Sequence, residues 1–375
     1  MKIVIAGDYC PKDRVAELID SNRYENIFSD VTEIIAQADF RILNFECPIV
    51  NGECRPIEKN GPCLKTTKNS LKPIVDAGFN VVTLANNHFY DFGDKGITDT
   101  IDELDKLNIA HVGGGKNLNI SSEILFLQKG GKKVAIINCC EHEFSIATEN
   151  TAGCNPLNPI NQWYAIQKAR NTADYVIVIV HGGHEMCQLP SLRMKETYHF
   201  FIDSGADVVI NHHQHCYSGF EKYKGKPIFY GLGNFCFDWD GKRNSIWNYG
   251  FLVLLSFDEK KISFETIPYS QCDEKPVVRL LEDRKEFDKD ILSLNIIIQD
   301  TELLKQQHEK WMDHREGNYS ISLEPYSNRF FRFACRKGFL PHFFNKKRAI
   351  ELLNYVSCES HRDCMINMFS KQINK

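Results

Sequence analysis

The sequence predicts an α/β fold, and two observations carry that prediction. Over roughly the first 270 residues, short apolar runs typical of buried strands alternate with segments of helical periodicity. Several of these runs end in aspartate, glutamate, asparagine or histidine. Because functional side chains of α/β proteins gather on loops at the carboxyl ends of the strands, we expect these polar residues to meet at one edge of a sheet.

Five apolar runs are predicted as strands. They cover residues 2–6, 40–43, 79–85, 175–180 and 206–210. Helical patterns lie between them at residues 68–78, 96–108 and 191–205, and the first and last of these end at a glycine. Residues 123–140 and 250–267 are predicted hairpins, because each turns through glycine or charged residues between two apolar stretches. Some antiparallel pairing is therefore expected beside the parallel part.

The character of the chain changes near residue 272. Beyond it, helical patterns occur at residues 288–314 and 347–369, but no further strand leads into polar residues. The length of 375 residues suffices for one large domain and an appendage. We therefore predict a domain over residues 1–271 and a helical appendage over residues 272–375.

The composition excludes some functions. A net charge of −4 gives no strong field that would select nucleic acid or membrane. The N-terminus is typical of a strand rather than a signal peptide, and no run reaches the roughly 18 apolar residues of a membrane helix. The 14 cysteines form no C-x-x-C zinc pattern. We expect free thiols and a cytoplasmic protein, with peripheral contact at the inner membrane face as an open alternative.

Six side chains at the strand ends form a candidate metal site: Asp8, Glu46, Asn87, His181, His213 and His215. A single buried histidine is more often an ordinary core residue, but His213 and His215 would face the same side of an extended segment. Oxygen and imidazole donors suit Mn²⁺, Fe²⁺ or Zn²⁺, with Mg²⁺ also compatible. Six donors exceed the needs of one tetrahedral zinc and match two ions sharing a carboxylate, an arrangement that hydrolyses phosphoesters.

Six ordered motifs carry a family resemblance: Gly7-Asp8, NFECPIV at 44–50, LANNHFYDFGDKGI at 84–97, HGGHE at 181–185, SGADVVINHHQHC at 204–216 and IFYGLGNFCFD at 228–238. Over about residues 1–270 the chain resembles the capsule-synthesis CapA (PGA_cap) family, a branch of the calcineurin-like metallophosphoesterases. The resemblance implies a four-layer α/β/β/α sandwich with a helical C-terminal appendage. It also implies a metal site where the strand ends converge.

The resemblance assigns roles to the candidate residues. Asp8 and His215 would bind a first metal, Glu46 would bridge, and Asn87, His181 and His213 would bind a second. His88 would protonate the leaving oxygen or steady the phosphoryl group, and Asp91 would orient its imidazole. Two departures stand out: Cys10 occupies the position of a histidine usual in phosphoesterases, and Glu46 stands where they carry aspartate.

Seven further residues are candidates for contact with substrate: Asn44, Lys59, Lys65, Glu143, Glu185, His212 and Asn234. The lysines would hold an anionic group, although surface lysines are common. Glu143 has the alternative of an ordinary charged loop, and Glu185 and His212 that of solvent-facing polarity. Asn234 is expected to hydrogen-bond beneath the metal-binding loops.

Residues 328–348 interleave arginine and lysine with phenylalanine and contain no acidic residue. Such a segment could dock on anionic lipid, an acidic polymer or a partner enzyme. The alternative is a helical hairpin that buries its phenylalanines against the main domain. Nucleic acid is not an expected partner, because no recognition motif accompanies the basic run.

The predicted function is a metal-dependent, phosphoesterase-like hydrolase in the synthesis or remodelling of capsule or another anionic surface polymer. Its substrate would be the polymer or a phosphorylated intermediate, and capsule-synthesis enzymes are candidate partners. The alternative is a non-catalytic subunit that binds the polymer for a poly-γ-glutamate or capsule synthase. The His88–Asp91 pair favours the enzyme, whereas Cys10 in place of histidine favours the subunit.

Overall fold

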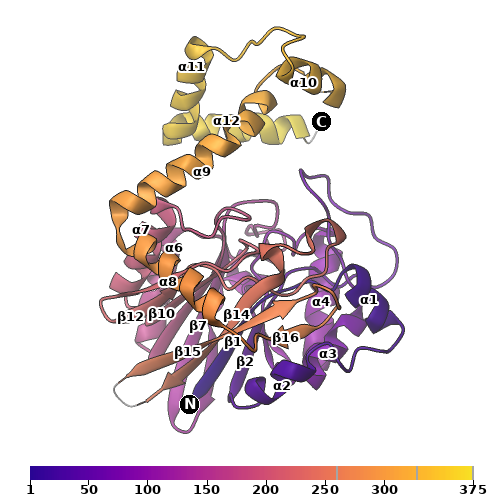
Figure 1. Cartoon of the computed structure of the whole chain (residues 1–375), viewed down its shortest axis with the longest axis vertical. Helices are drawn as coiled ribbons and strands as arrows, with labels where there is room; N and C mark the ends of the chain where they lie inside the picture. The colour runs from indigo at the N-terminus through magenta and orange to yellow at the C-terminus, as the bar shows by residue number, and fades with distance from the viewer. Residues whose placement is uncertain (259–260, 327, 374–375) are drawn as a thin grey trace. The chain divides into compact units, whose positions relative to one another are not determined.

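A computed structural model describes residues 1–258, 261–326 and 328–373 of the chain. The chain forms two compact units, Met1–Lys305 and Gln306–Lys375 (Figure 1). The first unit contains the strands and the second is helical. None of the described helices is long and apolar enough to cross a membrane.

The first sheet has the strand order β16-β15-β14-β1-β2-β3-β4, with β13 also paired to β1. Its strands are β1 (Lys2–Tyr9), β2 (Phe40–Phe45), β3 (Val81–Thr83), β4 (Ala110–Val112), β13 (Asn234–Cys236), β14 (Tyr249–Phe257), β15 (Ile262–Gln271) and β16 (Val278–Leu280). Strands β1 to β4 run parallel, and β14 to β16 add antiparallel partners. The predicted hairpin at 250–267 corresponds to β14 and β15.

The second sheet has the order β11-β12-β10-β9-β7-β6. Its strands are β6 (Leu125–Lys129), β7 (Lys132–Cys140), β9 (Tyr175–His181), β10 (Val208–His212), β11 (Phe220–Tyr223) and β12 (Lys226–Phe229), while β5 (Gly114–Gly115) and β8 (Gly153–Cys154) form a separate pair. The predicted hairpin at 123–140 corresponds to β6 and β7. Strands β7, β9, β10 and β12 are parallel.

Three apolar cores arrange these elements in four layers. One core lies between the sheets, where Ile3 and Ile5 of β1 meet Ile177 and Ile179 of β9. A second lies under α1 (Asp13–Asp20), α2 (Ser29–Ile35), α3 (Leu71–Asp76) and α4 (Gly93–Lys106), which cover the first sheet. A third lies under α6 (Pro159–Arg170) and α7 (Leu192–Asp203), on the second sheet. A short helix, α5 (Leu118–Ser121), contacts β5 and β8. The predicted α/β/β/α sandwich is confirmed.

This layering explains the continuous apolar runs of the sequence. Strand β9 is covered on both sides, so its side chains alternate between the inner core and the core under α6 and α7 without exposing a polar face. In β9 the polar residue His181 therefore stands at the carboxyl end of the strand. Register then aligns the strand ends: Asp8 pairs with Asn44 across β1 and β2, and His181 pairs with His212 across β9 and β10.

The first unit extends further than the predicted boundary at residue 272. Strand β16 pairs with β15, and α8 (Lys285–Gln299) inserts Phe287 and Ile291 into the core between the sheets. A helical pattern in the sequence does not reveal which unit a helix packs against. The division lies instead at residues 305 and 306, within α9 (Thr301–Ser322).

The second unit comprises the rest of α9 together with α10 (Arg329–Arg336), α11 (Lys346–Ser357) and α12 (Glu359–Ile373). Among its described residues only four are buried: His308, Ile321, Glu324 and Cys335. The phenylalanines of the basic-aromatic segment are largely outside any core, since Phe330, Phe331 and Phe343 are each about half exposed or more. The unit therefore has very little apolar interior of its own.

Candidate metal centre

Asp8, Glu46 and His215 form a buried group of potential metal donors. Asp8 lies near the end of β1, Glu46 directly follows β2, and His215 follows β10. Each offers one donor atom, and the three atoms lie within 4.8 Å of one another. Residues more than 200 positions apart thus meet because parallel strands of the two sheets end at the same place.

The Glu46 carboxylate is the most informative member of this group. It is fully buried, and neither oxygen has a hydrogen-bond partner among the described residues. The nearest basic atoms are Nε2 of His215 at 3.4 Å and Nε2 of His181 at 3.9 Å from Oε1. Burial raises the pKa of Glu46 well above its ordinary value. A buried carboxylate without donors is costly unless a cation compensates it, so this residue fits a metal ion.

Asp8 is held in its ionised form by its neighbours. Its Oδ1 accepts a hydrogen bond of 2.8 Å from the Asn44 amide, and its Oδ2 accepts one of 3.3 Å from the backbone N–H of His213. Burial by itself raises the pKa of Asp8. The effect of His215 and the other nearby imidazoles is larger and opposite, so the pKa lies well below the ordinary range. Asn44 therefore positions the carboxylate of Asp8, a potential metal ligand, and is not among the residues that line the cleft.

A second donor group surrounds the ring of His181. Its Nε2 lies 3.1 Å from Oδ1 of Asn87, 3.1 Å from Nδ1 of His213 and 3.9 Å from Oε1 of Glu46. Glu46 therefore belongs to the first group and also lies near the ring of His181, a position that suits a carboxylate shared by two ions.

His215 is oriented by Asn234 on β13. Oδ1 of Asn234 lies 2.9 Å from Nδ1 of His215, and an N–H donated there leaves Nε2 free to face Glu46. Burial lowers the pKa of His215, but the carboxylates of Glu46 and Asp8 outweigh it and raise the pKa to about 10. By contrast, burial lowers the pKa of His181 and of His213.

The backbone at the histidine cluster differs from the extended segment assumed from the sequence. Strand β10 ends at His212, and both His213 (φ 92°) and His215 (φ 55°) adopt positive φ. The expectation that an extended His-x-His presents both rings to one side was therefore wrong about the conformation. The two rings still approach the site, because the turn and not the strand directs them.

His88 and Asp91 form a hydrogen-bonded pair at the edge of the site. Nδ1 of His88 lies 2.7 Å from Oδ2 of Asp91, whose other oxygen forms an ion pair with the Lys59 ammonium. Lys59 also lies 3.2 Å from Nδ1 of His88. The backbone N–H of Leu64 donates to Asp91, so a loop from another part of the chain fixes the carboxylate. Burial lowers the pKa of His88.

A cleft of about 300 Å³ opens over these residues. It is lined by Lys59, Asn60, Gly61, Pro62, Asn87, His88, Glu143, Glu185, His215, Phe237, Trp239, Lys242 and Trp247. Sequence reasoning missed its aromatic wall of Phe237, Trp239 and Trp247. Aromatic residues usually indicate core, and only their proximity in sequence to Asn234 pointed to the site.

Of the remaining candidates for substrate contact, Glu143, Glu185 and His212 lie at or near the site, and Lys65 does not line the cleft. Glu143 accepts a hydrogen bond of 3.2 Å from the Asn87 amide, and Glu185 is exposed at the cleft. His212 is buried with neither ring nitrogen hydrogen-bonded among the described residues, 3.7 Å from Oδ1 of Asp8. Lys65 is exposed over the ring of Phe92 and is not among the residues that line the cleft.

Cys10 does not replace the missing histidine. It packs with Cys47, Phe237 and Trp247 in a small apolar cluster. Burial raises the pKa of Cys10 well above its ordinary value, so the side chain stays a thiol in this environment. The first donor group therefore has one aspartate, one glutamate and one histidine.

Proteins similar to this chain include two whose names refer to capsule or PGA biosynthesis. The chain is 31% identical over 246 residues to the "Capsule biosynthesis protein CapA" of Bacillus anthracis, covering 64% of this chain and 60% of that protein. It is 32% identical over 244 residues to the "PGA biosynthesis protein CapA" of Bacillus subtilis, covering 64% of each. The chain thus spans less than two thirds of the length of these relatives.

Solved structures with a similar arrangement include that of a novel phosphatase from Mycoplasma pneumoniae, at a TM-score of 0.46 and 17% identity over 73% of this chain and 95% of the other.

A family model matches residues 2–239, which include both sets of metal donors and the His88–Asp91 pair. The chain belongs to the family of the bacterial capsule synthesis protein PGA_cap.

Proposed function

We propose that the protein is a metal-dependent hydrolase that acts on an anionic surface polymer or on a phosphorylated intermediate of its synthesis. The observation that carries the proposal is the Glu46 carboxylate. It is buried without a hydrogen-bond partner among the described residues, is grouped with Asp8 and His215, and lies 3.9 Å from Nε2 of His181. A site for one structural ion would not require a second set of donors beside this carboxylate. Nor would it require a neighbouring acid–base pair.

The donors divide into two sets. Asp8, Glu46 and His215 would hold one divalent ion, and Glu46, Asn87, His181 and His213 a second. The donor chemistry suits Mn²⁺, Fe²⁺ or Zn²⁺, and Mg²⁺ less well because of the imidazoles. When bound, two such ions supply an acidified water and charge stabilisation for displacement at phosphorus.

The chain's own residues supply the remaining chemistry. His88 at the cleft would donate a proton to the leaving oxygen, and Asp91 would hold the imidazole in position by its 2.7 Å contact. Lys59, whose side chain is buried at the edge of the cleft, would balance the charge of Asp91. Asp91 and Lys59, which come from separate loops, would therefore hold His88 in place.

The lining of the cleft combines charged side chains with an apolar wall. Lys59 and Lys242 are positive, Glu143 and Glu185 are negative, and Phe237, Trp239 and Trp247 form the wall beside His215. An anionic substrate would pair with Lys242 and with the bound ions, and its apolar parts would contact the wall. The relatives whose names refer to capsule and PGA biosynthesis agree with a polymer of this kind. Capsule-synthesis enzymes are the proposed partners.

A second candidate function is a polymer-binding subunit without catalysis. Cys10 favours it, since the apolar packing of that thiol deprives the first donor group of a fourth residue. Such a subunit would use the cleft to hold the polymer for a synthase. The basic-aromatic segment 328–348, with its exposed phenylalanines, would offer an additional contact for polymer or for the inner membrane face.

The two functions are separated by measuring metal content and hydrolysis on protein purified without chelator. We expect His213→Ala to lower both metal occupancy and turnover of phosphomonoesters, phosphodiesters or γ-glutamyl amides. His111→Asn is the matched control, because His111 pairs with Asp105 away from the site. If the wild-type protein holds metal and binds anionic polymer but turns over none of these substrates, the subunit is the correct description.

A further inference from the structure

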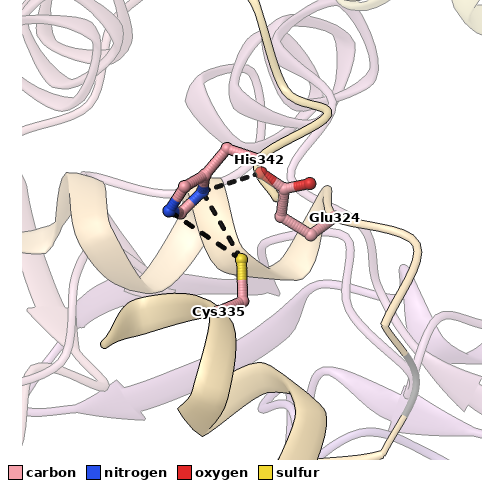
Figure 2. A group of neighbouring side chains, drawn as sticks. All are labelled: Glu324, Cys335 and His342. Atoms are coloured by element: carbon pink, nitrogen blue, oxygen red, sulfur yellow. Dashed lines mark hydrogen bonds and ion pairs between the residues drawn. The ribbon is translucent and has the colours of Figure 1, made fainter. Parts of the chain in front are cut away.

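A second cluster of metal-binding side chains lies in the C-terminal unit. Glu324 follows α9, Cys335 lies in α10, and His342 lies in the loop between α10 and α11 (Figure 2). Each offers one donor atom, and the three atoms lie within 4.8 Å of one another. Carboxylate, thiol and imidazole are the three side-chain donors that zinc takes in proteins. The cluster contains no residue of the site in the first unit.

The spacing of the donors agrees with a tetrahedral ion. Zinc bonds of about 2.3 Å to sulfur and about 2.0–2.1 Å to nitrogen or oxygen place neighbouring donors about 3.3–3.6 Å apart. Sγ of Cys335 lies 3.5 Å from Nδ1 of His342, and that nitrogen lies 3.1 Å from Oε1 of Glu324. Small adjustments of the half-exposed imidazole would therefore complete the geometry.

The surroundings supply an independent reason for an ion. Two of the three donors, Glu324 and Cys335, are among the four buried residues described in this unit. Small units that cannot bury a sufficient apolar core are commonly held by a disulfide or a metal. All described cysteines of the chain are free thiols, so no disulfide holds the described part of this unit, and a metal is one device that its side chains supply. The donors would join α9, α10 and the following loop.

Hydrogen bonding explains only part of the arrangement. The Glu324 carboxylate accepts N–H donors from the backbone of Phe343 and Phe344, at 2.8 and 3.2 Å, and so fixes the loop that carries His342. A loop-capping carboxylate of this kind does not need a buried thiol against the imidazole. Backbone donors that orient a carboxylate are, in contrast, a common support of metal ligands.

We propose that Glu324, Cys335 and His342 bind one zinc ion, with water as the fourth ligand, and that this ion is a structural element of the C-terminal unit. The proposal does not depend on the function of the first unit. The ion would compensate for the small core by linking three segments. His342, whose side chain is 58% exposed, leaves an entry path for the metal.

The test is zinc stoichiometry of the full chain, measured by elemental analysis after saturation and removal of excess zinc. We expect Cys335→Ser and His342→Asn each to bind about one zinc fewer per chain than the wild type. Cys358→Ser and His361→Asn are the matched controls, since both residues lie in the same unit outside the cluster, and should retain wild-type stoichiometry. His342→Asn guards against misfolding, because its side chain is the exposed member of the three.

Cobalt substitution identifies the sulfur ligand. We expect Co²⁺ to give a thiolate charge-transfer absorption that is lost in Cys335→Ser and kept in Cys10→Ala, because the site of the first unit offers only oxygen and nitrogen donors. An absorption that persists in Cys335→Ser would overturn the proposal. Equal zinc stoichiometry in the wild type, Cys335→Ser and His342→Asn would overturn it as well.

Discussion

The two units place metal-binding side chains in opposite structural settings. In the first unit the donors lie at the ends of strands in a four-layer core, and Asn44 and Asn234 orient Asp8 and His215 from behind. In the second unit the cluster of Glu324, Cys335 and His342 accounts for half of the buried residues described there. The comparison indicates that the first site is organised by the fold, whereas the second would organise its own surroundings.

Metal removal should give the largest difference between the units. With a chelator present, we expect hydrolysis to fall below detection, while amide protection in β1 and β9 stays close to that of the untreated protein because those strands are buried on both faces. Peptides covering residues 320–345 should exchange much faster. Hydrogen exchange with mass spectrometry measures both. Equal loss of protection in the two units would contradict the comparison.

Truncation of phenylalanine should separate the units by several kcal/mol. Phe235 is fully buried and stacks on Phe28 with ring centroids 4.9 Å apart, so Phe235→Ala should lower the free energy of unfolding by about 3–5 kcal/mol. Phe330 is 69% exposed, and Phe330→Ala should change it by less than about 0.5 kcal/mol. Urea denaturation gives both values. A large loss for Phe330→Ala would place this side chain in a core.

Replacement of the proton donor should slow turnover without removing metal. We expect His88→Asn to lower kcat by about a hundredfold, the usual scale for a general acid, while bound metal stays near the wild-type amount. Asp91→Asn should give a smaller loss, because it misorients the imidazole without deleting it. Elemental analysis beside steady-state kinetics measures the two effects. A parallel loss of metal in His88→Asn would assign this residue to the metal shell instead.

A smaller effect is expected at Asp238, which lies between the cleft residues Phe237 and Trp239 in the chain. Its carboxylate is buried and accepts hydrogen bonds of 2.9–3.0 Å from the side chains of Arg14 and Arg243. Burial by itself raises the pKa of Asp238, but these bonds hold it below the ordinary 3.8. We expect Asp238→Asn to lower the free energy of unfolding by about 2 kcal/mol at neutral pH.

The pH dependence of that loss follows from the direction of the shift. A carboxyl group whose pKa is depressed in the folded state contributes stability above its unfolded value of 3.8, and loses it as the pH falls through the folded value. The difference between wild type and Asp238→Asn should therefore be constant from pH 7 to about pH 5 and shrink below pH 3.8. Denaturation at several pH values measures it, and a difference that grows in acid would refute the assignment.

Much of the fold and of the candidate site could be predicted from local patterns. Continuous apolar runs such as 175–180 indicate strands covered on both faces, and the polar residue that ends each run marks the carboxyl edge of the sheet. Asp8, Glu46 and His181 could be singled out in this way. The extent of the first unit could not, because the packing of α8 against the sheets is not encoded in its helical period.

The sequence by itself determined the α/β class, the family resemblance and the donor types at the strand ends, since each depends on a short stretch of chain. Tertiary structure alone decided that Asn234 orients His215, that Lys59 joins the His88–Asp91 pair, and that Cys10 packs in an apolar cluster. It also decided that Cys335 meets Glu324 and His342. These contacts join segments distant in the chain, and they depend on strand register and loop packing, which no local periodicity specifies.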